Sequence, residues 1–90
     1  MPVKVNLHPW LSQAAGGQES TNVMGNTVGE CLAKVNAQFP GIKDKLLNKK
    51  GEVKNYVLIF LNGENTYPEE LSKTVKNGDE ISIIFVIDGG

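Results

Sequence analysis

Few side chains in this 90-residue sequence could take part in chemistry as nucleophiles, proton donors or metal ligands. Cys31 is the only cysteine and His8 the only histidine, and His8 has no second histidine, cysteine or carboxylate at ligand spacing. Gly16-Gly17 lacks the Gly-Lys-Ser/Thr ending of a phosphate-binding loop. Because no nucleophile–base pair and no metal-ligand cluster can be assembled, we do not expect hydrolysis or redox catalysis by this chain alone.

The same three features have simpler structural interpretations. Cys31 falls on an apolar helical stripe, where a free cysteine is a small core residue rather than a nucleophile or a persulfide carrier. His8 is expected to be a strand-end or surface imidazole. Gly16-Gly17 is expected to form a hairpin loop.

What remains is the pair Gly89-Gly90 at the end of the sequence. A carboxylate is a poor electrophile, so the carboxyl group of Gly90 would need activation before another group could be attached to it. Glycine has a thin cross-section and a wide range of φ and ψ, which suits a tail that enters a narrow channel. Taken alone, the pair could also be a frayed end. The family resemblance described below implies that Gly90 carries the chemistry and Gly89 gives access, with the catalytic groups supplied by partners.

Hydrophobic patterning predicts the elements of the first half of the chain. Residues 3–7 alternate between apolar and polar and predict a strand that ends at His8-Pro9, while residues 19–23 can return as a shorter strand. Thr27 and Glu30 fit a capping box, in which the glutamate reaches back to the cap's own N–H. A helix is thus expected over residues 28–39, ended by Pro40-Gly41, with a further helical turn over residues 42–47.

The second half of the chain is predicted to form strands and turns. Residues 56–61 are rich in β-branched and aromatic side chains, and the Asn62-Gly63 pair that follows favours a type I′ hairpin turn. A short edge strand is expected over residues 64–67 and a last strand over residues 80–87. The order β-β-α-β-β-β predicts an α+β fold in which one main helix packs on one face of a mixed sheet.

Alternation within the two long strands predicts a second functional surface. If residues 57, 59, 61, 81, 83 and 85 face the helix, then Leu58, Phe60, Ile84 and Val86 point to the uncovered side of the sheet. We expect these four side chains, together with Asp88, to face a partner. A homodimer contact or a turn of the chain could cover them instead, and another register would swap the faces.

Charge and hydropathy exclude several classes of partner. All nine basic residues are lysines and the net charge is −1, so nucleic acid is not expected as a partner. No stretch approaches the roughly 18 apolar residues of a membrane span, and the single cysteine suits a cytoplasmic protein. The lysines between residues 43 and 54 are expected to be solvated surface rather than a site for an acidic partner. Asp79, Glu80 and Asp88 are expected near the terminal carboxylate.

Several segments resemble the ubiquitin-like sulfur carriers over nearly the whole chain. The resemblance rests on Thr74-Val-Lys-Asn-Gly-Asp-Glu-Ile-Ser-Ile-Ile84 followed by the terminal Gly89-Gly90. This family includes the small subunit of molybdopterin synthase and the carriers that serve thiamin and cysteine biosynthesis. Gly16-Gly-Gln18, Phe39-Pro-Gly41 and Tyr56-Val-Leu-Ile-Phe-Leu-Asn-Gly63 look most like the cysteine-type carriers. The chain departs from the family at residues 85–88, where relatives usually carry proline and small residues.

The resemblance implies a β-grasp domain over residues 1–87, with a mixed sheet of four to five strands, and a flexible tail over residues 88–90. It further implies that a ubiquitin-activating-type enzyme adenylates Gly90 with ATP and that the tail becomes a thiocarboxylate. The acceptor would be a cysteine synthase-like enzyme or the large subunit of molybdopterin synthase. This chain would bind no cofactor or metal, and the partner would use the ATP. The alternatives are a ubiquitin-like modifier attached to target lysines and a binding module with a passive tail.

Overall fold

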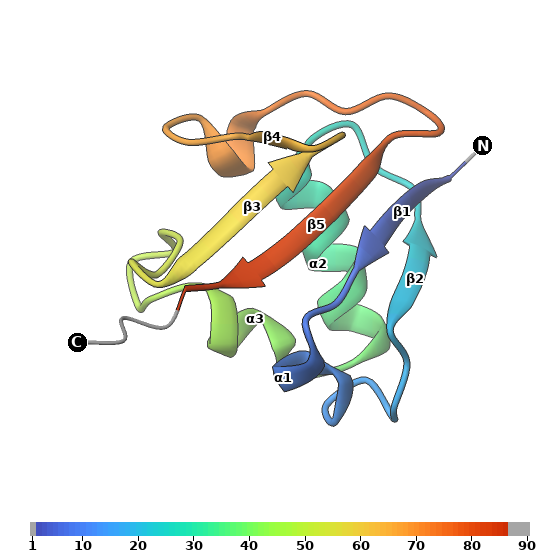
Figure 1. Cartoon of the computed structure of the whole chain (residues 1–90), viewed down its shortest axis with the longest axis vertical. Coiled ribbons are helices and arrows are strands. Elements are labelled where there is room, and N and C mark those ends of the chain that lie inside the picture. The colour runs from blue at the N-terminus through green and yellow to red at the C-terminus, as the bar shows by residue number, and fades with distance from the viewer. Residues whose placement is uncertain (1, 87–90) are drawn as a thin grey trace.

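A five-stranded mixed sheet forms the centre of the computed structural model, which describes residues 2–86 (Figure 1). Its order is β2-β1-β5-β3-β4, with β1 and β5 parallel and the other neighbours antiparallel. The strands span Val3–Asn6 (β1), Ser20–Val23 (β2), Val57–Leu61 (β3), Glu64–Asn65 (β4) and Glu80–Phe85 (β5). The predicted order of strands and the mixed sheet are therefore confirmed.

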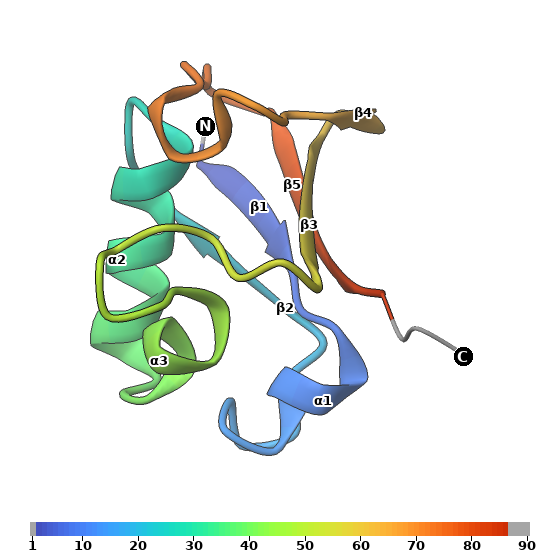
Figure 2. The same ribbon diagram turned by 90° about the vertical axis from the view of Figure 1, so that its left-hand side faces the viewer.

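Helix α2, Val28–Gln38, crosses one face of the sheet and leaves the other face open within the described part of the chain (Figure 2). The short helix α3, Ile42–Leu46, lies on the same side, where a helical turn was predicted. Two further short elements were not predicted: α1, Pro9–Ser12, and the 3₁₀ helix η1, Glu70–Ser72. The expected α+β architecture, with one main helix on one face, is confirmed.

The core lies between the sheet and the helical layer. Each of the larger aliphatic side chains there contributes roughly 1.5–3 kcal/mol when fully buried. Leu11 from α1 and Ile42 and Leu46 from α3 join the strand and α2 residues in this core, so the short helices are fixed by tertiary packing. Cys31 is fully buried in the same cluster, which confirms its assignment as a core residue.

The N-terminus of α2 is capped in a slightly different way from the prediction. Thr27 Oγ1 accepts from the Glu30 N–H at 3.1 Å, as expected, but Glu30 Oε1 accepts from the N–H of Asn26 at 2.9 Å and not from that of Thr27. Backbone hydrogen bonds join residues 26 and 28 to residues 75 and 73, which holds this segment extended against the chain after η1. The glutamate therefore closes the cap one residue further out.

The β3–β4 hairpin turns at Asn62-Gly63, and its geometry confirms the predicted type I′ turn, because both residues have positive φ, 52° and 86°. The Asn62 side chain also ties this turn to the start of β5. Its Nδ2 donates to Asp79 Oδ1 at 3.1 Å, and its Oδ1 accepts from the Glu80 N–H at 2.9 Å. These two hydrogen bonds hold the hairpin turn against the N-terminal end of β5.

Candidate functional site

Gly89, Gly90 and Asp88 lie outside the described residues, as does the predicted boundary between the domain and its tail. The structure instead defines the surface from which the tail departs. We call Phe85 and Val86, the last two described residues, the tail root. Their two side chains point to opposite sides of the sheet, so the tail root borders two different surfaces.

Strand pairing fixes the tail root in place. Phe85 pairs with Val57 across the antiparallel β3–β5 ladder, and the Val86 N–H donates to the carbonyl of Tyr56 at 2.8 Å. The chain thus stays bonded to the segment leading into β3 through its last described residue. Any tail beyond Val86 starts from a defined point at the end of the central sheet.

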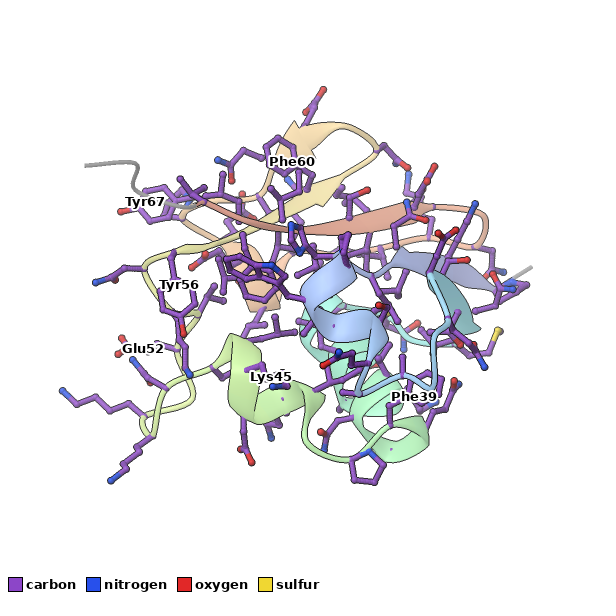
Figure 3. All side chains as sticks on the ribbon, turned by 60° about the horizontal axis from the view of Figure 1, so that its bottom comes forward. Phe39, Lys45, Glu52, Tyr56, Phe60 and Tyr67 are labelled. Atoms are coloured by element: carbon purple, nitrogen blue, oxygen red, sulfur yellow. The ribbon has the colours of Figure 1, made fainter. Side chains whose placement is uncertain are left out.

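One side of the tail root is the open face of the sheet, whose apolar part consists of Leu58, Phe60, Ile84 and Val86. Leu58 and Ile84 are register partners, while Ile84 is 39% and Val86 47% exposed. Figure 3 shows Phe60 on the side of the sheet away from the helices. The predicted division of the two faces is confirmed, and the alternative register is excluded. That these residues and Asp88 bind a partner stays a prediction.

The other side of the tail root carries an aromatic cluster that was not predicted, formed by His8, Trp10, Tyr56 and Phe85. The Phe85 ring centroid lies 5.1 Å from that of His8, 5.2 Å from Trp10 and 6.1 Å from Tyr56. Phe85 is buried, but Trp10 is 52% and Tyr56 46% exposed. Large exposed aromatic side chains of this kind are enriched at protein interfaces.

His8 holds the cluster together through α1. Its Nδ1 accepts from the Trp10 N–H at 3.1 Å, so the imidazole is the N-cap of α1, and Pro9 occupies the first helical position. His8 also stands edge-on to Trp10 at 5.2 Å. The predicted strand-end imidazole is confirmed. Among residues 2–86, no three histidine, cysteine, aspartate or glutamate side chains are grouped to hold a metal ion.

A groove of about 700 Å³ opens beside the aromatic cluster, and we call it the tail-root groove. Its apolar walls come from the cluster, and its polar side chains come from α3 and from the approach to β3. The Lys54 Nζ lies 5.9 Å from the centroid of the Tyr56 ring, within cation–π range. Figure 3 shows Tyr56 and Lys45 at this end of the molecule. The lining includes Trp10, Asp44, Lys45, Lys54, Tyr56 and Phe85.

Asp79 and Glu80 are predicted near the terminal carboxylate, which lies outside the described residues, but neither residue lies beside the tail root. Asp79 and Glu80 lie at the N-terminal end of β5, whereas the tail root lies at the C-terminal end of the same strand. Five residue steps along a strand separate Glu80 from Phe85, or roughly 17 Å at ~3.3 Å per residue. These two carboxylates are therefore remote from the tail root, and the charged side chains of the adjoining groove are Asp44, Lys45 and Lys54.

The Cys31 thiol takes no part in this site. Burial raises the pKa of the thiol, and the neighbouring Glu30 carboxylate raises it further. A thiol that is buried and kept protonated is a poor nucleophile. Its place on the buried side of α2 agrees with the structural role expected from the sequence.

A protein-family comparison decides which family this fold and tail represent. The model of the ThiS family matches residues 5–90, which include the second half of β1, the other four strands, the tail root and the terminal glycines. The chain belongs to the ThiS family.

Two curated relatives of this ThiS-family chain align over its full length and over theirs. The sulfur carrier protein CysO of Mycobacterium tuberculosis (strain ATCC 25618 / H37Rv) is 28% identical over 93 residues. A putative sulfur carrier protein of Archaeoglobus fulgidus is 32% identical over 91 residues. Similarity therefore extends across both the domain and the tail.

Solved structures show the same β-grasp fold. The Amycolatopsis orientalis BexX/CysO complex contains a chain with a TM-score of 0.90 and 28% identity, covering 98% of this chain and 99% of that one. Mycobacterium tuberculosis CysO matches with a TM-score of 0.88 and 26% identity, covering 94% and 99%. The expected likeness to ubiquitin-like sulfur carriers of the cysteine type is confirmed. None of the helices within residues 2–86 is long and apolar enough to cross a membrane.

Proposed function

We propose that this ThiS-family chain is a sulfur carrier and that Gly90 is the residue to which sulfur is attached. The observation that carries the proposal is the family match, which covers residues 5–90 and so includes nearly all of the fold and the tail. Full-length similarity to CysO of Mycobacterium tuberculosis supports a cysteine-type pathway over the molybdopterin one. The chain acts as a co-substrate of its partners rather than as an enzyme.

The chemistry takes place on the carboxyl group of Gly90 in two steps. A carboxylate oxygen attacks the α-phosphorus of ATP in the activating enzyme, pyrophosphate leaves, and an acyl-adenylate forms. A hydrosulfide equivalent then attacks the carbonyl carbon and displaces AMP, which leaves a thiocarboxylate. The thiocarboxylate is a nucleophile at neutral pH and delivers its sulfur to a biosynthetic enzyme. ATP belongs to the activating partner, and Gly89 allows the tail to enter both active sites.

The open face of the sheet is the main docking surface in this proposal. Leu58, Phe60, Ile84 and Val86 form an apolar patch that begins at the tail root, and Ile84 and Val86 are exposed. A partner that holds Gly90 must come against the end of β5, and burying this patch would contribute to the affinity. Asp88 would lie between patch and active site. The BexX/CysO complex shows that a similar carrier forms a complex with another protein.

Removal of Gly90 tests the proposal. The truncated chain should fold like the wild type, since residues 2–86 contain the whole sheet and core. It should fail to support ATP–pyrophosphate exchange by the adenylating enzyme from the same cells, because the wild-type carboxyl group is displaced by one residue. Truncation that leaves the function of the biosynthetic partner intact would favour a binding module with a passive tail.

A further inference from the structure

The tail-root groove is the feature of the molecule that the proposed docking surface leaves unused. It lies on the helical side of the sheet, with Phe85 in its wall, while the open face lies on the other side. We propose that this groove is a second docking site. It binds a segment of the activating enzyme in which an apolar side chain stands next to a carboxylate. This inference rests on the proposed function, since it assigns a second contact to the partner that adenylates Gly90.

The short length of the tail limits how far from the groove the activating enzyme can lie. Residues 87–90 add four residues beyond Val86, which span at most about 14 Å when fully extended. An enzyme that holds Gly90 in its active site must therefore lie against the surface around the tail root. Phe85 belongs both to the tail root and to the groove wall. The groove is thus within the area that such an enzyme covers.

The charge of the groove selects an acidic occupant. Residues 43–54 carry five lysines against Asp44 and Glu52, a net charge of +3, whereas the rest of the chain carries −4. Two of these lysines, Lys45 and Lys54, line the groove together with Asp44, so the lining itself has a net charge of +1. The Nζ of Lys54 is held near the Tyr56 ring, so its charge stands beside an apolar wall where a partner carboxylate would be partly desolvated.

The walls of the groove select an apolar side chain next to that carboxylate. Trp10 and Tyr56 are about half exposed, and both rings lie against Phe85. The Trp10 ring packs against the rings of His8 and Phe85, each at a centroid distance of 5.2 Å, so little side-chain freedom is lost on binding. An exposed, pre-positioned tryptophan is the kind of residue that dominates protein interfaces.

Steady-state kinetics of ATP–pyrophosphate exchange test the groove, with the full-length chain as the varied substrate and the adenylating enzyme from the same cells as the catalyst. The double variant K45Q/K54Q should raise KM for the chain about fivefold and leave kcat unchanged, because it removes two charge pairs at the contact. The control K34Q/K76Q removes the same charge from α2 and the turn before β5, and its KM should stay near the wild-type value.

A second pair of variants separates the apolar contact from the charge. Trp10→Ala should raise KM about tenfold, whereas Met24→Ala, an exposed apolar residue (54%) at the opposite end of the β1–β2 pair, should change it little. Thermal unfolding confirms that each variant is folded. Increasing ionic strength should raise KM for the wild type more than for K45Q/K54Q.

The outcomes distinguish the two proposals. If the wild-type chain supports no exchange, both the sulfur-carrier function and the groove contact are overturned. If the wild type is active but K45Q/K54Q and W10A keep its KM, the groove proposal alone is wrong. If K49Q/K50Q raises KM as much as K45Q/K54Q does, the partner contacts a diffuse basic surface and not the groove. If the free chain self-associates and W10A abolishes this association, the groove binds a second copy of the chain. Either result overturns the proposal.

Discussion

Phe85 connects the core to the surface that a partner must approach. It is 8% exposed, and it touches an imidazole, an indole and a phenol from segments far apart in the sequence. An aromatic ring here gives the tail root an apolar wall on its helical side, which is the basis of the tail-root groove.

Asp79 gives a prediction about stability at low pH. The Lys76 N–H donates to its Oδ2 at 2.8 Å and the Asn62 amide to its Oδ1, and these bonds lower the pKa of the carboxyl group. Because the folded pKa is below the unfolded one, the ionised carboxylate stabilises the fold above the unfolded pKa of ~3.9, and this contribution disappears as pH falls through the folded pKa.

The variant Asp79→Asn should therefore melt below the wild type at pH 7, and the difference should shrink as pH falls from about 5 to 2. Thermal unfolding followed by circular dichroism at several pH values measures both chains. Asn77→Ala serves as a control in the same turn. A difference between wild type and Asp79→Asn that is constant with pH, or that grows in acid, would contradict the assigned hydrogen bonds.

The elements differ in how far their sequences define them. Strand alternation, the Asn62-Gly63 turn and the α2 stripe are local patterns, and the structure agrees with each of them. Helix α1 has only four residues, too few to show a helical period, and its one sequence signal is Pro9 after a residue able to cap. Leu11, buried in the core, fixes it by tertiary packing.

The tail-root groove could not be predicted for a related reason. Its residues come from α1, α3, the approach to β3 and the end of β5, and the parallel β1–β5 pairing brings them together. The periodicity of apolar residues and the residues of the turns do not determine which strands pair in parallel. The open face was predictable, since alternation along β3 and β5 alone determines which side chains leave the core.

Helix α1 gives a prediction about the aromatic cluster. His8→Ala removes the N-cap acceptor for the Trp10 N–H and two ring contacts, and it should lower the free energy of unfolding by about 1–2 kcal/mol. Trp10 is the only tryptophan, so its fluorescence reports on the cluster directly. The emission of His8→Ala should shift to the red as the indole becomes more solvated.

His8→Asn is the matched control for that variant, because asparagine is a good N-cap residue but cannot supply the aromatic contacts. Its loss of stability should be smaller than that of His8→Ala. Urea unfolding of both variants gives the comparison. Equal stability of wild type and His8→Ala, with unchanged emission, would show that the cap and the ring contacts do not hold α1.

The molecule is asymmetric both in its distribution of charge and in the covering of its sheet by helices. The positive segment 43–54 lies toward the tail root, while Asp79 and Glu80 stand at the other end of β5. The helices cover one face of the sheet and leave an apolar patch on the other (Figure 2). The last described residues thus lie between an apolar face and a basic aromatic groove, which is a suitable platform for presenting a tail to another protein.

The central claim is that Gly90 carries sulfur, and intact-mass analysis of the chain from its native cells tests it most directly. We predict a population in which one terminal oxygen is replaced by sulfur, located by fragmentation to the peptide that ends in Gly90, and absent from the chain that lacks Gly90. Under sulfur-replete conditions, a chain with only an unmodified carboxyl group, together with isopeptide-linked conjugates on lysines of other proteins, would contradict the sulfur-carrier account and support a protein modifier.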